Sequence, residues 1–198
     1  MLAVATESDQ LTQAMRALEA AFLIGVEGVC EIWLARHADC YDDPGYDPDD
    51  PALSRLGREQ ASRLAERVRR AKPAAVYASP YRRALETARA ITDDVKVDPR
   101  LIEMSLELKP NGSMELQEDP AVVVSRMRAA LGDIARSHPG QRVVVISHGA
   151  AIITCLTDIL MLEPGRLRLL PYFTSVSVIR VLGDRAMVGG LTDTAHLA

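Results

Sequence analysis

Residues 32–40 read IWLARHADC, an apolar run that ends in an arginine and a histidine side by side. Short apolar runs of this kind are typical of buried strands, and neither arginine nor histidine extends such a strand. Residues 142–149 repeat the pattern, because RVVVISHG is a strongly apolar run that ends in a serine and a histidine. Two buried strands with chemically active side chains at their ends predict a ligand site at one edge of a sheet.

The segments around these runs alternate between strand and helix patterns. Further strands are expected at residues 74–79, near residue 96, and in a hairpin over residues 175–190 that turns at Gly183-Asp184. Helical patterns are found at residues 56–70, 81–92, 119–137 and 149–161. Strands that alternate with helices predict an α/β fold, a three-layer sandwich in which a mostly parallel sheet carries helices on both faces.

Residues 8–24 precede this alternation and are predicted to form an amphipathic helix. Leu11, Met15, Leu18 and Phe22 recur at spacings of three and four, so they share one helix face. We therefore divide the chain into an N-terminal helical extension, residues 1–28, and one domain, residues 29–198. Two interpretations of the extension stay open: it packs on its own domain, or its apolar face forms a contact in a homodimer.

The composition is that of an ordinary globular protein. Hydrophobic residues make up 48% of the 198 residues, charged residues make up 25%, and the net charge is −4. This balance provides no bulk basic field for nucleic acid, and no stretch is long and apolar enough for a membrane span, so we expect neither partner. Cys30, Cys40 and Cys155 form no CxxC pair and favour a reduced, cytoplasmic chain.

The residues that follow each strand are the candidate site residues, because ligands of such sheets bind beyond the carboxyl ends of the strands. Arg36 and His37 follow one strand, Arg83 follows another, and His148 opens the helix after a third. Glu103 comes after the short strand near residue 96. Parallel strands would bring these five side chains to one edge.

This set of side chains is suited to a phosphate group. Arginine presents a planar fork of donors that matches phosphate oxygens, and helix starts add free backbone N–H groups. A histidine there can be a neutral nucleophile toward phosphorus or a charged donor, and a glutamate can protonate the leaving oxygen. No Walker motif and no aspartate run for Mg²⁺ is present, which favours covalent catalysis through histidine without a metal or cofactor.

Each signal has a plainer interpretation when it is taken alone. An Arg-His dipeptide is weak evidence, His148 can be a satisfied core histidine, and Glu103 can be a surface acid. Arg82 is best explained as part of a solvated helix face. We interpret His138 and His196 as structural or solvent-exposed. Zinc is disfavoured because further ligands are not evident and the neighbouring arginines oppose a cation.

From about Glu31 to its C-terminus, the chain resembles the histidine phosphatase superfamily, which includes cofactor-dependent phosphoglycerate mutases and fructose-2,6-bisphosphatases. Five segments carry the resemblance in family order: LARHADC (34–40), DDPALSRLGREQASRLAERV (49–68), YASPYRRALETARAI (77–91), DPRLIE (98–103) and VVVISHGAAI (143–152). Each segment alone is weak evidence, whereas five in order form a specific match.

The resemblance implies a role for each candidate residue: His37 would become phosphohistidine, Arg36, Arg83 and His148 would hold the phosphate oxygens, and Glu103 would protonate the leaving oxygen and then activate water. Arg83, and not Arg82, matches the family arginine because it precedes Ala84 and lies four residues before Thr87.

The chain also departs from the family pattern. Ala38 replaces the usual glycine, which slightly limits backbone approach to the site. Residues 104–116, MSLELKPNGSMEL, lack the family's Gly-x-Trp-Glu-Gly stretch, and this leaves Glu107 as an alternative acid. The interval between Glu103 and His148 is too short for a large cap domain, so we expect an open site.

Three carboxylates, Asp39, Asp42 and Asp43, follow His37 and are expected to repel a doubly charged substrate. We therefore favour a metal-independent phosphomonoesterase that acts on a small phosphorylated substrate through phosphohistidine. The alternatives are a phosphoglycerate mutase-type phosphoryl transferase and a catalytically weak phosphate-binding or interaction module. The natural substrate stays open.

Overall fold

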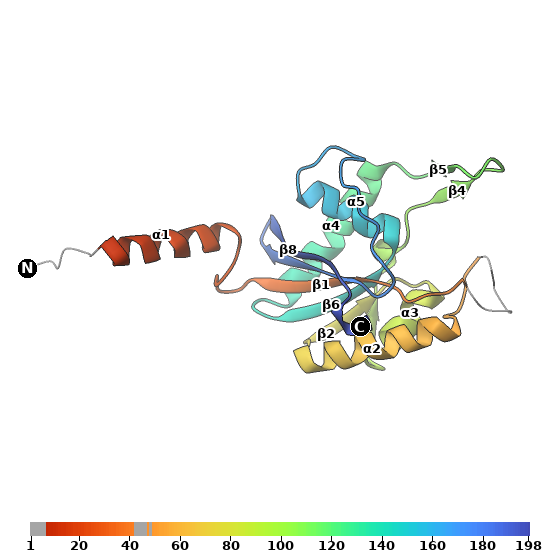
Figure 1. Ribbon diagram of the computed structural model, residues 1–198, viewed down its shortest axis with the longest axis horizontal. Helices are drawn as coiled ribbons and strands as arrows, with labels where there is room; N and C mark the ends of the chain where they lie inside the picture. Colours follow the sequence, from red (N-terminus) through yellow and green to blue (C-terminus); the bar gives the residue numbers. More distant parts are fainter. Residues whose placement is uncertain (1–6, 42–46, 48) are drawn as a thin grey trace, which may run out of the picture.

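A computed structural model describes residues 7–41, 47 and 49–198 (Figure 1). The helices are α1 (Glu7–Ala21), α2 (Arg55–Ala71), α3 (Arg82–Arg89), α4 (Pro120–Ser137) and α5 (Gly149–Ile159), with 3₁₀ turns at η1 (Pro99–Leu101) and η2 (Ala195–Leu197). The strands are β1 (Cys30–Arg36), β2 (Ala75–Ala78), β3 (Val95–Val97), β4 (Leu106–Leu108), β5 (Met114–Leu116), β6 (Arg142–Ser147), β7 (Val176–Leu182) and β8 (Arg185–Asp193).

Six of the strands form one mixed sheet in the order β3-β2-β6-β1-β7-β8. The four strands from β3 to β1 run parallel, whereas β7 and β8 form the predicted antiparallel hairpin at one end. Strand β1 lies between β6 and β7, so it is paired along both edges. The predicted α/β class with a mostly parallel sheet is therefore confirmed.

Alternating side chains of β1 build the two cores of the sandwich. Ile32 and Leu34 point into a core that includes Met127 of α4 and Ile152 of α5. Ala35 points into the opposite core, to which α2 contributes Leu64. Helices thus cover both faces of the sheet, and the three-layer arrangement follows from the two-residue period of the strands.

Three local features differ from the sequence-based expectations. Strands β4 and β5 form a separate two-stranded hairpin where no strand was expected. Helix α3 ends at Arg89, three residues before the predicted end at Thr92. Helix α2 (Arg55–Ala71) extends one residue beyond the predicted range 56–70 at each end. Its buried face runs through Gly57, Gln60, Ala61, Leu64, Ala65 and Val68, so Leu56 is 47% exposed.

Helix α1 extends away from the sheet and the other helices (Figure 1). The side chains of Leu11, Met15 and Leu18 are at least half exposed, and the chain first becomes buried at Leu23. The interpretation that this helix packs on its own domain is therefore wrong for the described residues. The homodimer contact and the division at residue 28 stay predictions.

The structure also bears on the membrane and on the three cysteines. None of the helices that the structure describes is long and apolar enough to cross a membrane. Cys30, Cys40 and Cys155 are buried free thiols, and burial raises the pKa of Cys30 to about 11 and that of Cys155 to about 12.

Candidate active site

The parallel register of β1 and β6 places the two candidate histidines side by side. Arg36 pairs with Ser147, and the backbone N–H of His37 donates to the Ser147 carbonyl at 2.9 Å. His37 and His148 therefore leave neighbouring strands at the same edge, with their ring centroids 5.1 Å apart. The convergence expected from the sequence is present for both imidazoles.

His37 is held as a neutral imidazole with a defined tautomer. The ring is 2% exposed, and its Nδ1 lies 2.7 Å from the carbonyl oxygen of Ala38. A carbonyl can only accept, so Nδ1 carries the proton and Nε2 keeps its lone pair. The pKa of His37 is lowered to about 3. Burial is the main cause, Arg83 and Arg36 act in the same direction, and the Ala38 carbonyl opposes them.

Arg36 crosses the site between the start of α5 and an aromatic ring. Its Nη1 donates to the carbonyl of Pro171 at 2.9 Å, and its guanidinium lies 4.0 Å from the centre of the Phe173 ring. A side chain at Gly149 would place its Cβ 3.4 Å from Arg36 Nε, so a glycine lets the arginine pack closely against α5. The buried Nε of Arg36 has no hydrogen-bond partner within the described residues.

His148 has one engaged and one unpartnered ring nitrogen. Its Nε2 lies 2.8 Å from the hydroxyl of Ser79, which follows β2, and Tyr81 stacks edge-on with the ring at 5.2 Å. Burial, reinforced by His37, holds the pKa of His148 well below its usual 6.5. Its buried Nδ1 has no partner in the described part of the chain, so it can serve a bound group.

The side chain of Arg83 lies at the site and that of Arg82 faces solvent, as the sequence predicted. The Arg83 side chain is 13% exposed, lies 3.9 Å from the Asp50 carboxylate, and stacks over Tyr81. The Arg82 side chain is 56% exposed and pairs with Glu86 on the outer face of α3. Only Arg83 of this pair lines the hollow beside the histidines.

Glu103 and Glu107 occupy different surroundings. The carboxylate of Glu103 accepts backbone N–H groups from Met104 and Ala151, both at 2.8 Å, so it is anchored at the start of α5. Glu107 lies on β4 and pairs with Lys109 at 2.8 Å. Glu103 lines the hollow, whereas Glu107 does not.

The hollow above the site has a volume of about 810 Å³, which is within the range of small-molecule sites. Arg83 and Glu103 line it, together with Cys40, Tyr41, Tyr81 and Gln117. His37 and His148 do not line it, but Tyr81, which does, contacts the ring of His148. Arg83, Glu103 and Tyr81 therefore connect the hollow to the site of the two imidazoles.

Comparison with known proteins identifies this arrangement. The family model of the histidine phosphatase superfamily (branch 1) matches residues 32–109 and 106–194, which is most of the chain. The chain belongs to the histidine phosphatase superfamily. It is therefore an enzyme of the phosphoryl hydrolase or transferase type, and the resemblance inferred from the five segments is confirmed.

Individual histidine phosphatases resemble the chain over most of its length. A Yersinia enterocolitica protein named "Probable phosphoglycerate mutase" is 28% identical over 84% of this chain and 94% of its own. The metal-independent phosphoserine phosphatase of Arabidopsis thaliana is 26% identical over 74% of this chain and 73% of its own. The crystal structure of Entamoeba histolytica phosphoserine phosphatase with 3-phosphoglyceric acid, 21% identical, superposes with a TM-score of 0.70 over 85% of this chain and all of that one. This last likeness shows the histidine phosphatase fold.

Asp39, which was expected beside the mouth of the site, does not line the hollow. The Asp39 side chain is buried and accepts the hydroxyl of Ser54 at 2.5 Å, which ties the loop after His37 to the start of α2. This carboxylate therefore helps to hold the loop that follows His37. Asp42 and Asp43 lie outside the described residues.

Two aromatic neighbours of the histidine phosphatase site were missed. Phe173 contacts Arg36 and His37, and Tyr81 contacts His148 and Arg83. Tyr81 lies inside a quoted motif, two residues before Arg83, and that spacing was an available signal. Phe173 precedes β7 in a segment without a motif, so only the sheet order brings it to the site.

His138 and His196 lie outside the candidate active site. His138 is structural as predicted, with Nε2 3.0 Å from the Tyr77 hydroxyl and Nδ1 2.9 Å from the Gln141 amide oxygen. His196 lies at the C-terminal segment, half-buried. Within the described ranges, histidine, cysteine and carboxylate side chains form no group of three that could hold a metal ion.

Proposed function

We propose that the protein is a metal-independent phosphomonoesterase that transfers the phosphoryl group of a small substrate to His37 and then to water. The observation that carries this proposal is the buried ring of His37, whose Nδ1 faces the Ala38 carbonyl. Its Nδ1 proton is held by the Ala38 carbonyl and its pKa is about 3, so Nε2 is an unprotonated nucleophile at neutral pH.

The groups that would bind the phosphate oxygens surround this nucleophile. Arg36 and His148 each have a buried nitrogen without a partner in the described residues, namely Nε and Nδ1. A buried donor without an acceptor is costly, and an oxyanion would accept from Arg36 Nε and, in the tautomer that carries the proton on Nδ1, from His148 as well. Arg83 adds a third cationic or polar donor from the wall of the hollow.

In the first step, the Nε2 lone pair of His37 forms a bond to phosphorus as the bond from phosphorus to the leaving oxygen breaks. Glu103 supplies the proton that the leaving oxygen takes up. This role is assigned to Glu103 because its carboxyl group lines the hollow into which the substrate would bind, as Arg83 does. In the second step, Glu103 takes a proton from water, which attacks phosphorus and releases His37 and inorganic phosphate. Glu107 is not assigned this role, since its carboxylate is paired in the β4–β5 hairpin.

The hollow supports a small phosphorylated substrate, and relatives narrow the choice for a first screen. Names of relatives mention phosphoserine and phosphoglycerate, so both phosphate esters belong in that screen. A mutase would return the phosphoryl group to a second hydroxyl, whereas a phosphatase releases it. Quantifying inorganic phosphate against isomerised product for 3-phosphoglycerate separates the two activities.

The proposal is tested by the turnover of p-nitrophenyl phosphate in the presence of EDTA. We expect activity in the wild type, and a loss of at least about 1,000-fold in His37→Ala because the nucleophile is gone. Trapping of acid-labile phosphohistidine in the wild type, and not in the variant, identifies the intermediate. Activity that survives in His37→Ala would overturn the assignment of the nucleophile.

Adjacent arginines provide a matched pair for the phosphate-binding role. Arg83→Gln is expected to lower kcat/KM by about 10- to 1,000-fold, as expected for a lost charge-assisted contact to phosphate, whereas Arg82→Gln leaves it within about twofold. The two variants remove the same charge one residue apart. Equal effects would contradict the assignment of Arg83.

A further inference from the structure

A second hollow, with a volume of about 930 Å³, lies between α2 and the segment that follows β8. It shares no lining residue with the hollow of the active site. We call it the arginine groove, and define it by Trp33, Arg63, Arg67, Arg70, Asp193 and His196. Its volume is within the range of small-molecule sites, about 300–1,000 Å³.

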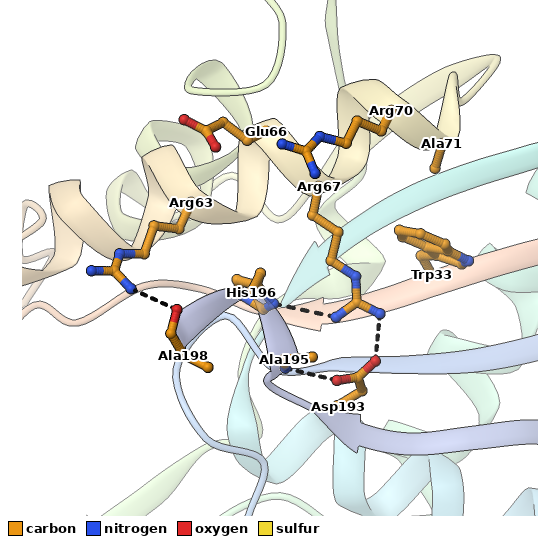
Figure 2. A pocket seen from close by; sticks show the side chains of 10 residues that line it. All are labelled: Trp33, Arg63, Glu66, Arg67, Arg70, Ala71, Asp193, Ala195, His196 and Ala198. Carbon is orange, nitrogen blue, oxygen red and sulfur yellow. Dashed lines mark hydrogen bonds and ion pairs between the residues drawn. The ribbon is translucent and has the colours of Figure 1, made fainter.

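The groove concentrates guanidinium groups from one side of a helix. Arg63, Arg67 and Arg70 follow one another at spacings of four and three in α2, so they share a face. In Figure 2, Arg63 and Arg67 extend from the helix toward the C-terminal segment, and Trp33 lies beyond Arg67. The Arg67 guanidinium is 5.2 Å from the centre of the Trp33 ring.

Two of the three arginines lack an aspartate or glutamate partner in the described part of the chain. Arg67 pairs with Asp193 at 2.5 Å. Arg63 donates to the backbone oxygens of Leu197 and Ala198, and Arg70 makes neither a hydrogen bond nor an ion pair there. The acidic side chains of the lining are Asp193 and Glu66, so two carboxylates face three guanidinium groups. This excess of guanidinium groups over carboxylates favours binding of an anion.

His196, which lines the groove, is connected through Thr174 to the backbone of Arg36 in the active site. The Thr174 hydroxyl donates to the Phe173 carbonyl at 2.7 Å, so the 3.1 Å contact with His196 requires His196 Nε2 to donate. His196 Nδ1 is then free to accept from Arg67, at 3.3 Å. The backbone N–H of Thr174 in turn donates to the Arg36 carbonyl at 3.1 Å. Hydrogen bonds thus fix the orientation of His196 and Arg67 in the groove.

We propose that the arginine groove is a second binding site, which takes a small anion with two or more phosphate groups. Guanidinium forks bind phosphate oxygens in pairs, and the separate positions of Arg63 and Arg70 along α2 suit an anion with more than one such group. The proposal is independent of the reaction assigned to His37. Its site lies on other residues and its test does not use turnover.

Trp33 provides a direct reporter, because it is the one tryptophan of the chain and lines the groove. The experiment titrates inorganic pyrophosphate into the full-length Arg36→Gln protein at constant ionic strength and follows tryptophan fluorescence. The Arg36→Gln background weakens phosphate binding at the active site. We expect a saturable change, with an affinity at least about tenfold weaker when Arg63→Gln and Arg70→Gln are added.

A matched control removes the same charge from the same helix outside the groove. Arg55→Gln with Arg69→Gln should keep the affinity, since Arg55 pairs with Glu59 and Arg69 donates to the Ala90 carbonyl. Arg70→Gln alone, which breaks no contact, should weaken binding in a protein with an unchanged circular dichroism spectrum. No saturable change, or equal losses in the groove and control variants, would overturn the proposal.

Discussion

Gly57 lies where the first turn of α2 passes beneath the loop that follows His37. A Cβ at this position would be 1.9 Å from the carbonyl oxygen of Asp39, so any side chain must displace the backbone. That backbone is otherwise well held, since Ser54 N–H donates to the Asp39 carbonyl at 3.0 Å. The requirement for glycine is therefore a steric condition on the active-site loop.

Gly57→Ala is expected to destabilise the protein by about 1–3 kcal/mol, because the overlap with Asp39 must be relieved by a backbone shift. The free energy of unfolding in urea measures this. Gly132→Ala in α4 is the control, since its Cβ would meet only the flexible end of Arg136 at 3.4 Å. That change should stabilise the helix by up to about 1 kcal/mol. A Gly57→Ala protein as stable as the wild type would contradict the steric argument.

The two buried histidines predict a pH dependence of stability. An unfolded histidine titrates near 6.5, whereas the folded pKa of His37 is about 3 and that of His148 is also lowered. Between these values the unfolded state binds more protons, so the free energy of unfolding falls as the pH drops from about 6.5 toward about 3. Above that window, neither histidine contributes a slope.

His37 should contribute a slope of about 1.4 kcal/mol per pH unit within this window, and His148 contributes a slope of the same sign below about pH 6.5. His37→Gln should therefore show a slope shallower by about that amount, measured by urea unfolding at a series of pH values. Carboxylates titrate in both proteins and cancel in the comparison. Parallel pH profiles would mean that His37 is not held neutral in the folded state.

At the scale of single elements, helix α1 carries the remaining prediction of a partner. A helix of this length is marginal in water unless its apolar face is packed, and here that face is exposed. The described contact to the body of the protein includes a hydrogen bond from Arg185 to the Ala21 carbonyl at 2.7 Å, which is a weak attachment.

If two copies pair through this face, deletion of residues 1–28 converts a dimer into a monomer. Sedimentation equilibrium of the full chain and the truncated chain measures the masses. A matched variant, Leu11→Gln with Leu18→Gln, keeps the length but removes two apolar side chains from the face. A full-length protein that sediments as a monomer would contradict the prediction.

Elements with a strong apolar period were predictable, and the short ones were not. Strand β6 is a continuous apolar run, and α4 begins at a proline capped by Asp119, whose side chain accepts the Ala121 N–H. Strands β4 and β5 have three residues each, too few for an alternating pattern to stand out. Their pairing depends on each other, so no single stretch indicates it.

Site residues at the ends of buried strands were predictable from the sequence, whereas those placed by tertiary contacts were not. Arg36, His37 and His148 end buried strands, where polar residues are unexpected and therefore visible. The place of Asp39 was not predictable, because a carboxylate beside the nucleophile looks available until its hydrogen bond to Ser54 is seen. Phe173 reaches the site through the antiparallel pairing of β7 with β1, which sequence periodicity does not specify.

At the scale of the whole molecule, the strand order constrains how the chain acquires its shape. Strand β1 is the first of the sheet to leave the ribosome, yet its two neighbours, β6 and β7, come from the far end of the chain. Contacts between distant segments form slowly, because a long loop must close before they gain any free energy. The nascent chain therefore holds Arg36 and His37 on an unpaired strand until β6 and β7 have been synthesised, and only then can the nucleophile meet its neighbours.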